Sequence, residues 1–121
     1  MNSAFKEVLK EHDYDCVIFH DVDMLPEDDR NIYQCESNPV HLSPLIDKFD
    51  YKPYGTDFGG ITMLRPEHFI AANGMSNLFW GWGREDDDMQ FRVGRSPFNG
   101  KNIANVFKCL LAFLIKFFKM S

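Results

Sequence analysis

Residues 16–23, Cys-Val-Ile-Phe-His-Asp-Val-Asp, decide the fold that the sequence predicts. Their first four members form a continuous apolar run between acidic residues, which is typical of a strand buried on both faces in a parallel sheet. Upstream, Phe5, Val8 and Leu9 recur at the spacing of one helix face, and this predicts an amphipathic helix over residues 3–10. A helix that leads into a buried strand indicates an α/β architecture.

The composition limits the function classes. A chain of 121 residues, 45% of them hydrophobic, has the size of one domain and is too apolar for intrinsic disorder. Its net charge of −5 argues against non-specific nucleic-acid binding, because no basic stripe is available for phosphates. The first residues are charged and lack the apolar segment of a signal peptide, so we expect neither a signal peptide nor an anchor in this stretch.

The middle of the chain alternates loops with short elements. Residues 25–60 are rich in Pro, Asn, Asp and Tyr and are predicted to be mostly loop. A Gly-Gly pair precedes a second predicted strand over residues 60–64, and Pro66 stands near the first turn of a short predicted helix.

The end of the chain differs in composition. From Val93 the acidic residues stop, and residues 106–120 are rich in Phe, Leu and Lys. The uninterrupted apolar run over residues 109–115 is much shorter than the ~20 residues that span a bilayer. We expect a core helix or a non-native terminus here, with an interfacial helix as the less favoured alternative.

The three cysteines cannot all pair with one another. Cys16 and Cys35 are buried thiols in a reducing compartment or close a loop in an oxidising one. Composition does not distinguish these alternatives.

A first acidic segment, Asp21-Val22-Asp23, directly follows the predicted strand. Ligand crevices of α/β folds lie at the carboxyl ends of parallel strands, so both carboxylates can face one bound ion. Hard cations such as Mg²⁺ and Mn²⁺ prefer oxygen ligands and often complete their shell with substrate phosphates. The Asp-x-Asp pattern also occurs elsewhere in the chain, so the prediction of a metal site rests on the position of this copy directly after the strand. The alternative is a solvated turn in which an Asp caps a helix.

A second acidic segment, residues 85–88, ends the stretch Trp-Gly-Trp-Gly-Arg-Glu-Asp-Asp-Asp that begins at Trp80. Glycines let the backbone approach a ligand, and Trp rings offer flat faces to sugars or bases. A carboxylate beside a Trp is partly desolvated, which raises its proton affinity and suits a general base. The alternative is an acid-rich helix N-terminus favoured by the helix dipole. We expect the two acidic segments to border a common crevice.

Four stretches together resemble the beta-1,4-galactosyltransferase family: FHDVDMLPEDDRNIYQC, HLSPLIDKFDY, FGGITML and NGMSNLFWGWGREDDD. The resemblance covers residues 5–92 without large gaps, and the WGWGxEDDD pattern is its most specific part. It implies a partial GT-A (Rossmann-like) domain of the α/β class, with a parallel-rich mixed sheet and long loops. Residues 1–92 would be a catalytic-domain fragment, and residues 93–121 an unmatched tail, non-native or helical.

The resemblance also implies an activity and a compartment. The family transfers galactose from UDP-galactose, with Mn²⁺ as cofactor and with inversion, to a 4-hydroxyl, usually of N-acetylglucosamine. Its members are type II membrane proteins of the Golgi. No nucleic-acid partner is expected.

The resemblance assigns roles to matching positions. Asp23 would bind the metal, and Asp86 would be the catalytic base. Cys16 and Cys35 match a family disulfide, which fits an oxidising lumen. The positions that would contact the donor are Asp21, Val22, Asp23, Lys48, Gly59, Gly60 and Trp82. Those that would contact the acceptor are Gly83, Arg84, Glu85, Asp86 and Asp87.

Three departures from the family pattern affect these expectations. The family's Met/His metal ligands and long acceptor loop do not follow the second acidic segment, and the first nucleotide-binding strand, stem and anchor are not matched. Asp57 stands where galactosyltransferases carry Tyr, which leaves galactose and N-acetylgalactosamine as alternative donors. At Arg84 the sequence resembles the xylose-specific branch of the family, whereas at the paired cysteines and the acidic run it resembles the main branch. We therefore expect an incomplete copy with little or no transferase activity.

Two other function classes stay open. A metal-dependent phosphoryl-transfer or hydrolytic enzyme would use the same carboxylates on two ions and release phosphate or free sugar. A non-catalytic sugar-binding fragment would bind an acceptor without metal and tolerate Asp86→Asn.

Overall fold

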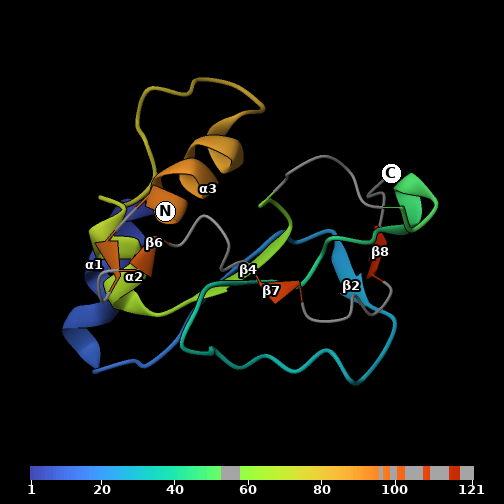
Figure 1. Ribbon diagram of the computed structural model, residues 1–121, viewed down its shortest axis with the longest axis horizontal. Helices are drawn as coiled ribbons and strands as arrows, with labels where there is room; N and C mark the ends of the chain where they lie inside the picture. The colour runs from blue at the N-terminus through green and yellow to red at the C-terminus, as the bar shows by residue number, and fades with distance from the viewer. Residues whose placement is uncertain (53–57, 96, 99–100, 103–107, 110–114, 118–121) are drawn as a thin grey trace.

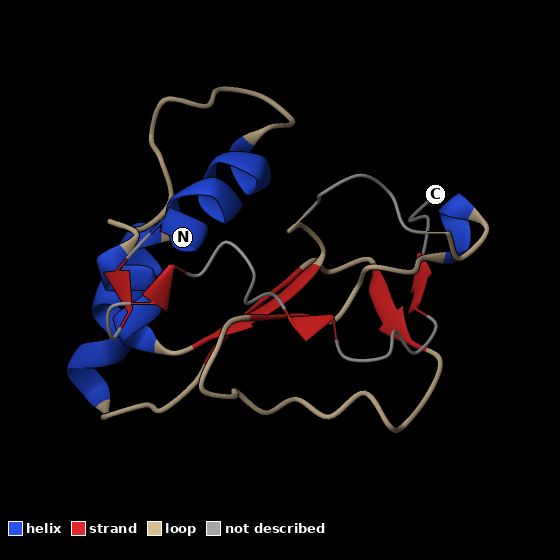
Figure 2. Ribbon diagram, viewed as in Figure 1, coloured by secondary structure: helices blue, strands red, loops and turns tan. Residues whose placement is uncertain are grey.

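The computed structural model describes residues 1–52, 58–95, 97–98, 101–102, 108–109 and 115–117 (Figure 1). The helices are α1 (Asn2–Glu11), α2 (Pro66–Ala71) and α3 (Glu85–Arg95), with a short 3₁₀ helix, η1 (Asp47–Phe49). The strands are β1 (Val17–His20), β2 (Met24–Pro26), β3 (Val40–His41), β4 (Ile61–Leu64), β5 (Pro97–Phe98), β6 (Lys101–Asn102), β7 (Lys108–Cys109) and β8 (Ile115–Phe117). Figure 2 shows α1, α2 and α3 grouped at one end of the central sheet and the β2–β8 pair at the other. The predicted first helix, both predicted strands and the helix that Pro66 opens are all present.

The central sheet is mixed, with strand order β1-β4-β3-β7. β4 is antiparallel to both β1 and β3, while β7 is parallel to β3. The expectation of a mixed α/β sheet is confirmed, but the expectation of parallel neighbours for β1 is wrong, since Val17 pairs with Leu64 in an antiparallel register. The expected burial of this strand on both faces is also wrong, because β1 is only partly buried and its continuous apolar run does not encode the direction of its neighbour.

β4 is the strand that is buried on both faces. Ile61 and Met63 point into one hydrophobic cluster, shared with Val40 of β3, and Leu64 points into a second, shared with Phe69 of α2. All four residues of β4 are buried, whereas β1 is only partly buried. Alternation of side chains across the strand therefore lets β4 join the two halves of the core.

The tail differs from the expected helix where it is described. After α3 ends at Arg95, the described residues lie in short strands, with β7 paired to β3 and β8 paired to β2. Apolar, aromatic residues satisfy either period, and pairing to a free strand edge supplies backbone hydrogen bonds. In the part of the chain that is described, no helix is both long and apolar enough to cross a membrane.

A disulfide joins Cys16 to Cys35, as the family resemblance implied. The two Cα atoms lie 5.4 Å apart, and the bond closes the loop that holds the first acidic segment and β2. Closing this loop restricts the unfolded chain and attaches the loop to the start of β1.

We expect the double variant Cys16→Ser/Cys35→Ser to lose about 3 kcal/mol of unfolding free energy, because the bond closes a loop of sequence separation 19. Urea unfolding followed by circular dichroism measures this loss. Cys109→Ser, which leaves the bond intact, is the control. Equal unfolding midpoints for the double variant and the control would contradict the prediction.

Arg92 attaches α3 to the end of α2. Its guanidinium contacts the Asp88 carboxylate one turn earlier, with 2.7 Å between nitrogen and oxygen. It also donates to the carbonyl oxygens of Ala72 and Gly74, beyond the C-terminus of α2. These bonds satisfy carbonyls that the end of a helix leaves without partners, and they fix the orientation of α3.

Arg92→Gln should therefore destabilise the protein by about 2 kcal/mol, because it leaves Asp88 and two carbonyls without a charged donor. Arg95→Gln on the same helix removes only the contact of an exposed guanidinium with the Phe91 ring, 4.0 Å from its centroid, and should cost less than about 1 kcal/mol. Thermal unfolding of both variants tests the difference, and similar losses would refute it.

Candidate functional site

A cavity of about 230 Å³ lies between the end of β1, the turn before β4 and the first turn of α3. Asp21 of the first acidic segment and Asp86 of the second both line it, with Gly59 and Gly60 between them. The expectation that the two segments border a common crevice is therefore confirmed. The cavity is smaller than the ~300–1,000 Å³ of typical small-molecule clefts, so it accommodates part of a ligand.

The glycine turn, residues 59–60, contacts a residue of each acidic segment. The Asp21 amide donates a 2.9 Å hydrogen bond to the Gly60 carbonyl. On the other side of the turn, a Cβ atom placed on Gly59 would lie 2.6 Å from Oδ2 of Asp86. Gly60 has a φ of +79° and its missing Cβ would collide with Ser43, so this position requires glycine, while a side chain at position 59 would displace the Asp86 carboxylate.

A pair of polar side chains from β3 and its continuation holds this turn. His41 Nε2 lies 2.8 Å from the Gly59 carbonyl oxygen, and Ser43 Oγ donates to the same oxygen at 2.9 Å. The Ile61 amide donates to Ser43 Oγ at 2.7 Å. A carbonyl oxygen only accepts hydrogen bonds, which assigns the His41 proton to Nε2. Burial lowers the pKa of His41 and keeps the ring neutral.

Like charges gather at the cavity. Partial burial raises the pKa of Asp21 above its usual 3.8, and the negative charges of Asp23 and Glu85 raise it further, while His20 opposes them. Oε2 of Glu85 is buried and has no hydrogen-bond partner among the described residues. This concentration of negative charge is the environment in which a bound cation is stabilised.

The backbone of the first acidic segment is fixed by a second polar pair. His20 Nδ1 lies 2.7 Å from the Asp21 carbonyl oxygen, and Nε2 lies 2.8 Å from the Tyr33 hydroxyl. The two rings are stacked, with their centroids 5.7 Å apart. Because the carbonyl accepts, Nδ1 carries the proton and the Tyr33 hydroxyl donates to Nε2.

The sequence interpretation missed these supporting residues. His20 precedes the first acidic segment directly, and His41 and Ser43 belong to one of the stretches that carry the resemblance. Their alternation across Leu42, a core residue, was the available signal, since it places both polar side chains on the same face of an extended segment.

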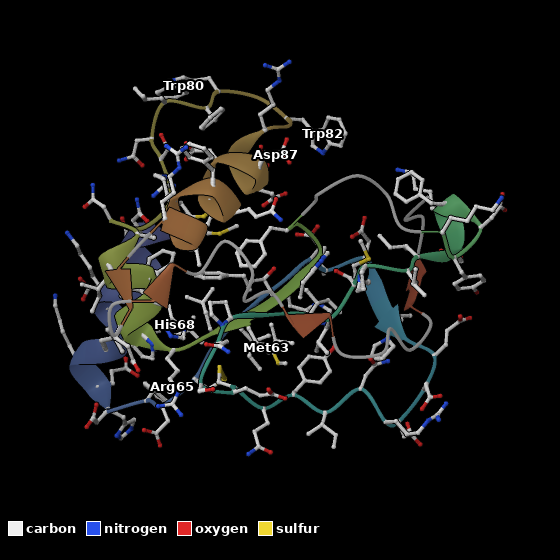
Figure 3. The ribbon with its side chains drawn as sticks, viewed as in Figure 1. Met63, Arg65, His68, Trp80, Trp82 and Asp87 are labelled. Carbon is white, nitrogen blue, oxygen red and sulfur yellow. A yellow bond between two sulfur atoms is a disulfide. The ribbon has the colours of Figure 1, made fainter. Side chains whose placement is uncertain are left out.

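The loop that carries Trp80 and Trp82 does not place either indole at the cavity. Trp80 and Trp82 are 92% and 97% exposed, and Figure 3 shows both on the loop that leads to α3, with Trp82 nearer to Asp87. Gly81 and Gly83 have positive φ values and no heavy atom within 4 Å of a Cβ placed on them. The loop therefore holds its indoles in solvent.

Other predicted site residues do not line the cavity either. They are Val22, Asp23, Lys48, Trp82, Gly83, Arg84, Glu85 and Asp87. Lys48 lies in η1, with Nζ 5.6 Å from the centroid of the Phe49 ring. Asp57, the position that bears on donor choice, falls outside the described residues. No group of three or more His, Cys, Asp or Glu side chains forms a ready-made metal site in the described part of the chain.

Two protein-family models together match nearly all of residues 1–110. Residues 40–110 match a family model described as the N-terminal domain of galactosyltransferase, and residues 1–36 match the N-terminal region of glycosyl transferase group 7. The first match overlaps the segment 93–121, and the division of the chain at residue 92 stays a prediction.

Individual proteins agree with these matches. Beta-1,4-galactosyltransferase 1 of Mus musculus is 50% identical over 94 residues, which are 77% of this chain and 24% of the relative. Beta-1,4-galactosyltransferase 6 of Rattus norvegicus is 52% identical over 99 residues, which are 81% of this chain and 26% of the relative. The chain thus spans about a quarter of the length of these relatives.

Solved structures show the same relationship. The catalytic domain of Drosophila beta-1,4-galactosyltransferase 7 in complex with xylobiose is 44% identical, with a TM-score of 0.56 over 66% of this chain and 33% of that chain. A mutant of that enzyme in complex with manganese, UDP-Gal and xylobiose is 43% identical, also with a TM-score of 0.56 over 66% of this chain and 33% of that chain. The fold matches part of these catalytic domains, the expected partial GT-A class, and the chain belongs to the beta-1,4-galactosyltransferase family.

Proposed function

We propose that the chain carries part of the donor and acceptor sites of an inverting, Mn²⁺-dependent glycosyltransferase. It moves galactose, or N-acetylgalactosamine, from a UDP-sugar to the 4-hydroxyl of an N-acetylglucosamine or xylose acceptor. The observation that supports this most is the shared cavity, which Asp21 and Asp86 line together with the glycine turn. Both reacting partners need to be held at one place for direct transfer, and this cavity lies between the two acidic segments.

Asp86 is the proposed catalytic base. Its carboxylate lies against Gly59 at the edge of the cavity, in the first turn of α3. There it takes the proton of the acceptor hydroxyl as that oxygen attacks the anomeric carbon from the side opposite UDP. A single displacement of this kind inverts the anomeric centre.

Asp23 is the proposed metal ligand, with Asp21 and Val22 at the donor nucleotide. The carboxylates suit a hard divalent cation, and the repulsion that raises the pKa of Asp21 is relieved by positive charge. Bound Mn²⁺ supplies charge neutralisation for the departing diphosphate. A solved relative contains both manganese and UDP-Gal, which supports this assignment. Lys48, Gly59, Gly60 and Trp82 are the other proposed donor contacts.

The acceptor side is proposed to comprise residues 83–87 together with the exposed loop. The indole of Trp82 offers a flat apolar face to a sugar ring, and binding a ring against it removes orientational freedom before reaction. Xylobiose complexes of a relative that is 44% identical support a xylose-type acceptor as one alternative.

An oxidising compartment is proposed for the protein. The disulfide between Cys16 and Cys35 supports it, because such bonds persist in the secretory pathway and are rare in the cytosol. The Golgi lumen, the compartment that the family resemblance implies, meets this requirement.

Incubation of the 121-residue chain with UDP-galactose or UDP-N-acetylgalactosamine, Mn²⁺ and either acceptor tests the function. Because the sequence predicts an incomplete copy, we expect β1,4-linked product, identified by NMR, only at a low rate, and a further fall of about 10²–10⁴-fold in Asp86→Asn. Asp29→Asn, a surface substitution outside the cavity, is the control. Free sugar without disaccharide would indicate a hydrolase, and metal-independent acceptor binding unaffected by Asp86→Asn would indicate a binding module.

The raised pKa of Asp21 leads to a separate prediction about stability and pH. A carboxyl whose pKa is raised by folding binds its proton more tightly in the native state, so stability falls as pH rises from 3.8 to the raised value and stays lower above it. Asp21→Asn should therefore raise the melting temperature of the metal-free protein at pH 7 by about 2 °C and have no such effect at pH 3. Mn²⁺ should stabilise the wild type more than this variant. An Asp21→Asn melting temperature equal to that of Asp29→Asn at pH 7 would contradict the prediction.

A further inference from the structure

Gly59 is contacted from two sides, at its carbonyl oxygen and at its Cα atom. On one side, its carbonyl oxygen is bonded by His41 Nε2 at 2.8 Å and by Ser43 Oγ at 2.9 Å. On the other side, Oδ2 of Asp86 approaches so closely that a Cβ on Gly59 would lie 2.6 Å from it. The carboxylate thus lies directly beside the backbone unit that His41 and Ser43 hold, and a shift of Gly59 toward it would displace it.

The donors to Gly59 stand on a rigid support. His41 pairs with Thr62 in the β3–β4 register, and the Leu42 amide donates to the Ile61 carbonyl at 2.9 Å. Ser43 receives the Ile61 amide at 2.7 Å, so the same hydroxyl connects the turn with the start of β4. His41 also packs beside Phe58, with ring centroids 6.2 Å apart. The backbone that carries both residues is therefore fixed to β4, and the Ser43 hydroxyl is bonded to it directly.

We propose that His41, assisted by Ser43, is a positioning residue for Asp86: by fixing the Gly59 carbonyl it sets where the Asp86 carboxylate stands in the cavity. The inference rests on the proposed function, because it takes Asp86 to be the base. His41 touches neither substrate nor metal in this account. Its effect reaches the reaction through one backbone unit, and a misplacement of about 1 Å of a reacting group can cost 10²-fold in rate.

Two substitutions separate this role from simple support of the fold. His41→Phe keeps a ring beside Phe58 and removes the donor to Gly59. His41→Gln keeps an N–H at the corresponding distance along the side chain. We expect His41→Phe to lower kcat by about 100-fold with little change in the KM for the UDP-sugar, and His41→Gln to restore most of the rate. His68→Gln, at the histidine that is buried in α2, should lower the melting temperature without this loss of kcat.

A measurement on the folded chain without substrate keeps the inference independent of activity. NMR signals of the Gly59 amide and the Asp86 carboxyl carbon should move in His41→Phe, return toward the wild-type positions in His41→Gln and stay unchanged in His68→Gln. The disaccharide assay tests the proposed function, whereas these signals need no turnover and decide the inference on their own. Unmoved Asp86 signals in a folded His41→Phe variant would overturn it.

Discussion

The contact between the Asp86 carboxylate and the backbone of Gly59 is the constraint on which the site depends. A Cβ at position 59 would lie 2.6 Å from Oδ2 of Asp86, so a side chain there would displace the carboxylate from its place beside the turn. The next residue, Gly60, receives the amide of Asp21 on its carbonyl. Two consecutive glycines therefore bring together two acidic residues that lie far apart in the sequence. Gly60 binds the Asp21 backbone by a hydrogen bond, and Gly59, which has no side chain, leaves room for the Asp86 carboxylate.

The hydrophobic core gives this turn its rigidity. β4 begins immediately after the glycine turn, and its buried residues belong to both core clusters. α3 is oriented by Met89 and Val93 in one cluster and by the bonds of Arg92 to the end of α2. The positions of Asp21 and Asp86 are thus set by packing at some distance from the cavity, which is the usual way a scaffold fixes a site.

The sequence predicted the parts of this arrangement that depend on local pattern. The apolar run indicated β1, the Gly-Gly pair preceded β4 and Pro66 indicated the start of α2. The acidic run does start a helix, α3, which was predicted only as the alternative to a ligand-binding segment. The direction of β1 was predicted wrongly, since its apolar run does not specify a partner. The network of His41, Ser43 and Gly59 could not be predicted either, because it exists only when β3 and β4 pair.

The four consecutive acids of α3 do not share one explanation. Asp88 has a structural role, because it pairs with Arg92, and Asp87 is exposed at the helix start. Glu85 has a buried oxygen that finds no hydrogen-bond partner in the described part of the chain, and its charge acts on Asp21. Folding alone gains nothing from this repulsion, and buried polar atoms without partners are rare in native proteins. Natural proteins keep such costs where function requires them, so the unfavourable charges at this cavity support a ligand that brings positive charge.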